Sequence, residues 1–249
     1  MSAAAANIKT IAKRELGAYF SSPVAYVFIV IFLLLCGVFT FILGGFFQRG
    51  QANLESFFLW HPWLYLFLVP AVGMRLWSEE RRLGTMELLL TMPVTAWQAI
   101  VGKFLASWLF LAVALVLTFP IVITVNYLGN ADNGVIFAGF VGSWLLAGAF
   151  LAVTSVTSAL TRNQVISFIV SVVVCLFLVL AGIPPVVEFL AGKLPGWLVD
   201  GLAAFSVFPH YDRFQKGLLD SRDWIFFLSA AGFCLFATGV VIRNLRSGH

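Results

Sequence analysis

Segment 79–93 holds the densest group of ionisable side chains in the sequence. Three glutamates and two arginines flank an apolar run there, and the candidate functional residues are Glu79, Glu80, Arg81, Arg82, Gly84, Thr85, Met86, Glu87, Leu88, Leu89 and Pro93. A short helix that begins at Thr85 and ends at Pro93 would carry Glu87 in its favourable first turn. Such a helix can insert apolar side chains into a partner's groove, while its charges set the orientation. The alternative is a solvated loop whose leucines rest on the membrane surface, and composition does not separate the two.

Enzymatic chemistry has no comparable support in the sequence. We find no GxxxxGK[ST] nucleotide-binding loop, no GxSxG or HExxH motif, and no Cys or His pair at metal-ligand spacing. The three cysteines lie inside apolar runs, where they are expected to pack as small hydrophobic residues. We therefore expect no catalytic activity, cofactor or metal in this chain. Energy for any work would come from another subunit.

The elements that hold segment 79–93 are expected to lie in lipid. Of the 249 residues, 61% are hydrophobic and only 10% are charged, whereas about 25% are charged in a soluble domain. Basic residues outnumber acidic ones by 15 to 11. In a membrane protein this excess marks cytoplasmic loops and contact with anionic lipid, so we expect no nucleic acid partner.

Six stretches between ionised residues are long enough to cross a bilayer at about 1.5 Å per residue. They predict an all-α polytopic membrane protein with six continuous transmembrane helices over 24–47, 57–75, 100–127, 134–160, 164–187 and 224–242. No repeat or linker divides residues 1–249, which we treat as one transmembrane domain. Capping boxes are expected at Thr95 with Gln98 and at Thr161 with Gln164, and Asp220 or Ser221 can cap the last span.

The distribution of Lys and Arg predicts the orientation of these spans. Ten of them fall on one side of the predicted membrane and five on the other. The positive-inside rule places the richer side in the cytoplasm, so both termini are predicted to be cytoplasmic (N-in, C-in). Apart from Arg75 and Lys103, which lie at the cytoplasmic ends of their predicted spans, His61 is the one Asp, Glu, Lys, Arg or His residue expected inside a span. It lies near the outer end beside Pro62, where contact with a lipid headgroup is favoured over a proton relay.

Two further segments lie outside the spans. Residues 5–20 predict an amphipathic helix suited to the membrane interface, with Ile8, Ile11, Ala12, Leu16, Tyr19 and Phe20 opposite Lys9, Thr10, Lys13, Arg14 and Gly17. A simple topology anchor for the first span is the alternative. Segment 188–222 is broken by Pro and Gly and predicts short re-entrant helices on the outer side before the last span. Its candidate outer-gate residues are Pro209, His210, Tyr211 and Phe214, and the alternative is interfacial packing with Trp197 and Tyr211 as aromatic anchors.

These motifs together resemble one known family. Glu80-Arg-Arg-Leu-Gly-Thr-Met-Glu-Leu-Leu-Leu-Thr-Met-Pro-Val-Thr, followed by Gly102-Lys103, resembles the first cytoplasmic loop of ABC-2 type transporter permeases. Lys13-Arg14-Glu15-Leu16 and Ser22-Pro23 match the opening of that family. Phe208-Pro-His-Tyr-Asp-Arg-Phe is similar to its gliding-motility-associated and nitrous-oxide-reductase-accessory subgroup. The resemblance extends over the whole chain at matching topological positions.

The resemblance implies a multi-pass permease of the bacterial inner membrane. Two permease chains, identical or related, would pair above two copies of a cytoplasmic ABC ATPase subunit that binds ATP and Mg. Segment 79–93 would be the coupling helix that enters the ATPase, and 5–20 the connecting helix, with Lys13, Arg14 and Glu15 near the ATPase. The expected function is ATP-driven export or extraction of a substrate. The alternative is a non-transporting scaffold that passes ATP-driven motion to a periplasmic or membrane accessory protein.

Overall fold

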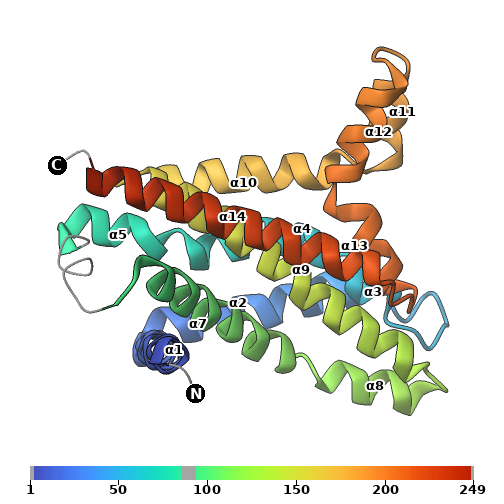
Figure 1. The fold of residues 1–249 in the computed structure, drawn as a ribbon. Coiled ribbons are helices and arrows are strands. Elements are labelled where there is room, and N and C mark those ends of the chain that lie inside the picture. Colours follow the sequence, from blue (N-terminus) through green and yellow to red (C-terminus); the bar gives the residue numbers. More distant parts are fainter. Residues whose placement is uncertain (1–2, 86–93, 248–249) are drawn as a thin grey trace.

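The computed structural model describes residues 3–85 and 94–247, and these residues form helices and turns without a strand (Figure 1). Met86, Glu87, Leu88, Leu89 and Pro93 lie outside the described residues. The helices are α1 (Ala3–Ser21), α2 (Pro23–Val38), the π-helical turn η1 (Phe39–Leu43), α3 (Glu55–Phe58), α4 (His61–Gly73), α5 (Arg75–Leu83), α7 (Ala96–Val116), α8 (Pro120–Leu128), α9 (Asn133–Leu160), α10 (Gln164–Leu180), α11 (Pro184–Ala191), α12 (Gly196–Phe205), α13 (Val207–Gln215) and α14 (Ser221–Ser247).

Five helical stretches in the described part of the chain are long and apolar enough to cross a membrane. They are Pro23–Leu43, Glu55–Leu83, Ala96–Leu128, Asn133–Leu160 and Ser221–Asn244. A sixth span is obtained if α10 and α11, which are bent by 77° at a short break, count together. The prediction of an all-helical polytopic membrane protein is therefore confirmed.

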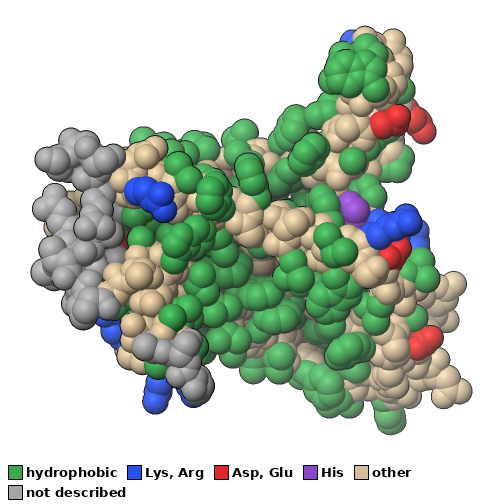
Figure 2. All heavy atoms as spheres, viewed as in Figure 1, with side chains coloured by type: hydrophobic (Ala, Val, Ile, Leu, Met, Phe, Trp, Pro, Cys, Tyr) green, Lys and Arg blue, Asp and Glu red, His purple; other side chains and the backbone are tan. Residues whose placement is uncertain are grey.

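Helix α9 forms the centre of the bundle and contacts α4, α5, α7, α10, α13 and α14. Most of its 28 residues are buried, many of them glycine, alanine or serine. Small residues let neighbouring helices approach closely, which is the usual basis of helix packing in lipid. The outer faces of α2, α10 and α14 instead expose large apolar side chains. Figure 2 shows apolar side chains covering the middle of the visible face, while charges gather towards its ends.

The predicted spans differ from the observed helices where proline restarts the chain. Span 100–127 is two helices, because α7 ends at Val116 and Pro120 begins α8 after a short turn. Span 164–187 is likewise wrong as one helix, since α10 ends at Leu180 and Pro184 opens α11. Proline is favoured at the first helical position, where its missing N–H costs no hydrogen bond.

The first two spans also end at different residues from those predicted. The first helix reaches Leu43 rather than residue 47, and Gly45 and Gly50 then adopt positive φ angles in the turn that follows. The second span does not stop at Arg75, because α5 continues to Leu83 after a single turn residue, Met74. Charges on α5 therefore extend a helix that begins inside the apolar bundle.

Helix caps follow the sequence in two of three cases. Thr95 and Gln98 form the predicted capping box at the start of α7. Asp220 accepts a hydrogen bond from the backbone N–H of Arg222 at the start of α14. The predicted Thr161 box is wrong, because Asn163 caps α10 by accepting from the backbone N–H groups of residues 165 and 166. Asn163 directly precedes α10, so its side chain reaches the first N–H groups of the helix, whereas Thr161 lies two residues further away.

Helix α1 has the predicted amphipathic character. Its apolar side is half-buried against the bundle, while the basic positions 9, 13 and 14 are exposed. It packs chiefly on α7. Figure 1 shows α1 nearly end-on while α7, α9 and α14 run across the page, so α1 lies across the spans. A helix in that direction suits the interface of a membrane that α7 and α9 cross.

The far end of the bundle carries α3, α13 and the α11–α12 hairpin, opposite the end at which α5, α9 and α14 finish (Figure 1). We call the end at which α5, α9 and α14 finish the terminal end. The hairpin projects away from the bundle, and α11 has no buried residue. Phe189, Trp197 and Phe205 on the hairpin are largely exposed. Segment 188–222 thus contains short helices, while their re-entrant position on the outer side stays a prediction.

Candidate functional site

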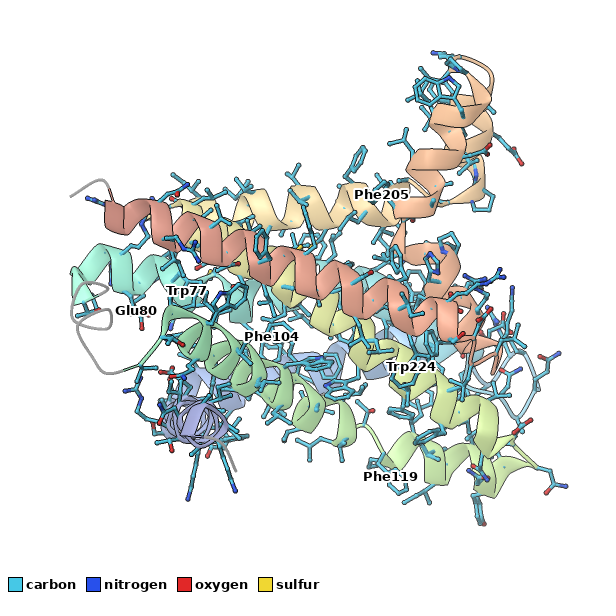
Figure 3. The ribbon with its side chains drawn as sticks, viewed as in Figure 1. Trp77, Glu80, Phe104, Phe119, Phe205 and Trp224 are labelled. Carbon is cyan, nitrogen blue, oxygen red and sulfur yellow. The ribbon has the colours of Figure 1, made fainter. Side chains whose placement is uncertain are left out.

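Three segments distant in sequence meet at Lys103 at the terminal end. The Lys103 ammonium lies 2.9 Å from Glu80 Oε1 on α5 and 3.5 Å from Glu15 Oε2 on α1. Arg14 completes the group, because its Nη2 lies 2.8 Å from Glu15 Oε1. We call Arg14, Glu15, Glu80 and Lys103 the Lys103 cluster. Figure 3 shows Glu80 on α5 close to the start of α7.

Burial makes the interactions of this cluster strong. The side chain of Lys103 is only 8% exposed, and a buried ammonium needs ionised or aromatic partners to offset its lost hydration. The Trp77 ring, with its centroid 5.6 Å from Nζ, adds a cation–π contact. Burial alone would raise the pKa of Glu15, but the charges and hydrogen bonds of Lys103 and Arg14 outweigh it and hold that pKa below its ordinary value.

Helix α1 is fixed to α7 along its length beside this cluster. Tyr19 OH and Ser107 Oγ are 2.9 Å apart, and the Tyr19 ring stacks on Phe110 with centroids separated by 5.0 Å. Burial raises the pKa of Tyr19 to about 12, so its hydroxyl keeps its proton at neutral pH. Asn7 also donates to the side chain of Gln98 near the start of α7. Rotation or translation of α1 must therefore be transmitted to α7.

Helix α5 is fixed to α9 by a hydroxyl from the centre of the bundle. Ser158 Oγ accepts from the backbone N–H groups of Trp77 and Ser78 at 3.0 Å each, and donates to the carbonyl of Met74 at 2.8 Å. The first N–H groups of a helix have no partner within it, so Ser158 supplies the cap that α5 lacks. The Trp77 indole N–H also donates to Ser155, at 3.1 Å. Trp77 is fully buried, and Figure 3 shows it on α5 close to α7.

The described residues of segment 79–93 have different environments. Arg81 donates to the carbonyl of Ala159 at the end of α9, 2.6 Å away. Gly84 ends α5 with a φ of 71°, a left-handed conformation that favours glycine. Arg82 and Thr85 are exposed, whereas Glu79 is half-buried. Among the residues of this segment that the structure describes, Glu80 alone joins the Lys103 cluster.

Lys13, Arg14 and Glu15 also separate in the structure. Arg14 and Glu15 join the Lys103 cluster, whereas Lys13 is exposed and has no ion pair among the described residues. Sequence reasoning placed Lys103 in a family motif but gave it no role, and it did not single out Ser158. A lysine within the apolar sequence Ala96–Val116 was the available signal, because a charge inside such a helix requires a partner. Ser158 carried no comparable signal.

The candidate gate residues lie on α13, which is packed against the far end of the bundle. Tyr211 is fully buried and donates to the carbonyl of Phe58, 2.9 Å away. Phe214 is also buried and lies so close to Gly142 of α9 that a Cβ there would come within 2.4 Å. Pro209 is half-buried. The burial of Tyr211 rules out the alternative in which it anchors the protein in the aromatic belt, while Trp197 is 73% exposed.

His210 takes part in a second charged group at the far end. Its Nδ1 lies 2.6 Å from Asp223 Oδ1, and Arg213 Nη2 donates to the same oxygen at 2.5 Å. The His210 ring also stacks on Phe226, with centroids 3.9 Å apart. Asp223 is fully buried. This group joins α13 to the start of α14, so the candidate gate is tied to the last span.

The prediction that His61 contacts lipid headgroups is wrong. Its side chain is fully buried and its ring lies among Phe32, Phe57, Phe58 and Tyr65. Nδ1 is 2.9 Å from the carbonyl of Phe57. The first helical turn after Trp60 thus directs His61 into the core. In the described residues no three His, Cys, Asp or Glu side chains form a group that could hold a metal.

The architecture defines a class: a polytopic helical membrane protein in which Lys103, at the start of the third span, is ion-paired both to the N-terminal helix and to the end of the second span. Residues 9–199, well over half of the chain, match the family model described as ABC-2 family transporter protein. The chain therefore belongs to this family, and is a permease component of an ABC transporter that associates with an ATP-binding subunit. The match includes all of the Lys103 cluster but not residues 208–223, on which the resemblance to the gliding-motility subgroup depends. Comparison with curated proteins found no match.

Proposed function

We propose that this chain is the permease subunit that couples ATP hydrolysis in separate cytoplasmic subunits to export or extraction of a substrate across the bacterial inner membrane. The observation that supports this most is the Lys103 cluster, which joins α1, α5 and α7 at the residues of the family motif. Residues 81–85, the described part of segment 79–93 beyond Glu80, follow this cluster directly in the chain. A partner that binds this segment can therefore act on two spans and on the interfacial helix at once.

The contacts around α5 suggest how such a motion reaches the centre of the bundle. Displacement of residues 79–93 pulls first on α5, and α5 is attached to α9 through Ser158 and through Arg81. Helix α9 contacts most of the remaining helices. Packed helices move as rigid bodies between discrete arrangements rather than deforming continuously. ATP-driven approach of two ATPase subunits would thus be converted into relative movement of spans.

The proposed assembly contains two permease chains, identical or related, and two ATPase subunits that bind ATP and Mg. In this proposal both termini are cytoplasmic, which is supported by the excess of basic residues at the terminal end and by both chain ends lying towards that end in Figure 1. The large apolar faces of α2 and α10 provide surface for lipid and for a second permease chain. Closed two-fold pairs are the commonest oligomers.

A second candidate function is a scaffold without a transported substrate, and the α11–α12 hairpin favours it. The hairpin projects from the far end with exposed aromatic side chains and contacts the bundle little. It could receive a periplasmic or membrane accessory protein of the kind expected for the gliding-motility-like subgroup. The buried hydroxyls of α9 point in the same direction, since Thr154, Ser155, Thr157 and Ser158 bond within the protein rather than line a path.

Affinity purification of the tagged chain from native membranes, followed by mass identification and an ATPase assay, tests the proposal. We expect a P-loop ATPase to copurify with wild type. It should be lost in Glu80→Arg and Glu87→Arg, and retained in the control Glu188→Arg on the projecting hairpin. Recovery of the permease without an ATPase would refute the proposal.

A second assay separates the two candidate functions. Stimulation of ATP hydrolysis by small or amphipathic compounds supports transport. Stimulation only by a copurifying membrane or periplasmic protein supports the scaffold. In either case Glu87→Arg should leave the protein inserted in the membrane while abolishing the response.

A further inference from the structure

A cavity of about 480 Å³ lies beside the Lys103 cluster, between α1, α2, α4 and α5. One part of its wall is apolar and includes Val24, Ala25, Phe28, Val72 and Phe110. The other part is ionisable and consists of Glu15, Arg75, Glu79, Glu80 and Lys103, with Tyr19 and Ser22 between the two. A cavity with separate apolar and charged walls fits an amphipathic molecule.

The position of the cavity corresponds to the depth of lipid headgroups. Its wall includes α1, which lies across the spans, and the start of α2, where a membrane-spanning stretch begins at Pro23. Val24 lines the cavity and is 55% exposed on the outer surface of α2. The cavity therefore opens where a phospholipid beside α2 has its headgroup, and its apolar wall continues towards the acyl chains.

Some charged groups on the cavity wall have no partner among the described residues. Lys103 pairs with Glu15 and Glu80, but Glu80 Oε2 is buried without a hydrogen-bond partner. Neither Glu79 nor Arg75 is paired among the described residues, although they lie four residues apart on α5. A buried carboxylate oxygen without a donor costs free energy. Glu80 Oε2 has almost no accessible surface, so the wall offers one carboxylate for a cation, Glu79, and one guanidinium for an anion, Arg75.

We propose that this cavity binds the headgroup of a phospholipid that carries both a phosphate and a primary ammonium, as phosphatidylethanolamine does. The ammonium donates to Glu79, and the phosphate binds Arg75. Phosphatidylcholine has the same charges but no N–H to donate, and phosphatidylglycerol has no cation to place against the carboxylates. The apolar wall holds the first part of the acyl chains. The inference does not depend on which substrate, if any, the permease moves.

Native mass spectrometry of the full chain with any copurifying subunits tests the proposal. The purified protein is offered an equimolar mixture of phosphatidylethanolamine, phosphatidylcholine and phosphatidylglycerol with identical acyl chains. We expect about a tenfold preference for phosphatidylethanolamine, the effect of about one charge-assisted hydrogen bond. Equal retention of all three lipids, or a preference for either of the others, would overturn the proposal.

Three variants locate the preference. Glu79→Gln should remove most of the discrimination between phosphatidylethanolamine and phosphatidylcholine, because only the ammonium contact differs. Arg75→Gln should weaken both of these lipids, since each carries the phosphate. Ala18→Trp, at an exposed position on the cavity wall, should lower the amount of bound lipid without disturbing the core. The controls Glu188→Gln and Arg49→Gln lie outside the cavity and should bind as wild type.

Two results with these variants would overturn the lipid-binding proposal. An unchanged lipid preference in Glu79→Gln, with normal thermal unfolding, would show that α5 does not select the headgroup. Persistence of lipid binding in Ala18→Trp would show that the lipid is bound elsewhere. Because these measurements need no ATPase, they can fail while the coupling proposal stands, and the reverse also holds.

Discussion

Gly102 of α7 and Ile11 of α1 are in such close contact that a Cβ on Gly102 would lie 2.7 Å from Ile11 Cγ2 and 2.9 Å from Ile11 Cβ. Carbon atoms do not approach to this distance, so any larger residue at 102 must displace α1. Displacement of α1 would also move Glu15 away from Lys103, the next residue on α7, and break their ion pair. Glycine at this position therefore allows the crossing that assembles the Lys103 cluster.

Gly102→Leu should displace α1 and destabilise the protein by about 1–3 kcal/mol, the usual cost of overpacking. Gly232→Leu is the matched control, because Gly232 also lies within a long helix but has no atom within 4 Å of the place that a Cβ would take. Thermal unfolding in detergent and cross-linking between α1 and α7 would measure the two effects. Equal behaviour of the two variants would refute the close-crossing argument.

Lys103→Met should destabilise the protein, because it leaves Glu80 without a cation and leaves Glu15 with Arg14 alone. A hydrogen bond to a charged group contributes about 1.5–3 kcal/mol, and Lys103 has two carboxylate partners. Adding Glu80→Gln should recover part of the loss, since it removes one unpaired charge. Lys193→Met, on the projecting hairpin, is the control and should unfold as wild type. A double variant no more stable than Lys103→Met would contradict the ion-pair interpretation.

The depressed pKa of Glu15 predicts a specific dependence on pH. Because the folded carboxyl has a pKa below its ordinary value of 4.5, the folded protein binds this proton less readily than the unfolded chain. The stabilisation is complete above pH 4.5 and is lost as the pH falls from there through the folded pKa. Glu15→Gln should lack this part of the acid sensitivity. Thermal unfolding from neutral pH to below 4.5 would show converging curves for the two proteins, and parallel curves would contradict the prediction.

The number and type of elements could be predicted from sequence because lipid imposes simple requirements. A stretch without charge that is long enough to cross must be helical, since its backbone finds no other hydrogen bonds there. The two sides of α1 followed from side-chain spacing alone. The ends of helices could not be obtained this way. An interval between charged residues limits where a helix can lie, but it does not determine the residues at which the helix begins and ends. Pro120 and Pro184 carry that information, since each is the first residue of a new helix.

The candidate site was predictable only where a side chain is costly to bury. Glu80 and Glu15 belong to recognisable charged motifs, so their segments could be selected from sequence. Their common partner, Lys103, required knowledge of which helices cross. Ser158 resembles every other small polar residue in α9, and its role depends on the α4–α5 turn lying beside it. Interactions of this kind depend on tertiary packing, and no local pattern records them.

Asp223→Asn should loosen the far end of the bundle. Asp223 is fully buried and accepts from Arg213, so its neutral replacement leaves a guanidinium facing a weaker acceptor. Asp212→Asn is the control, because Asp212 pairs with Lys216 where both side chains are exposed and such pairs contribute little. Limited proteolysis between α13 and α14 should be faster for Asp223→Asn only. Equal rates for both variants would show that burial does not distinguish the two pairs.

Ser158→Ala should separate α5 from α9 with almost no change in volume. The substitution removes the acceptor for the Trp77 and Ser78 N–H groups, and these become buried donors without partners. Loss of such a partner costs about 1–3 kcal/mol. The control Ser229→Ala removes an exposed hydroxyl that bonds only to the carbonyl of Phe226 in its own helix, and it should be neutral.

The effect of Ser158→Ala on activity distinguishes transmission from simple stability. If α5 carries motion to α9, the variant should still copurify with the ATPase, because segment 79–93 is unchanged, yet stimulation of ATP hydrolysis should fall. Comparison at a temperature well below unfolding excludes loss of folded protein as the cause. A variant that is destabilised but responds as wild type would show that Ser158 supports the fold without transmitting motion. Transmission would then have to pass through Lys103 and α7, which the Lys103→Met variant examines directly.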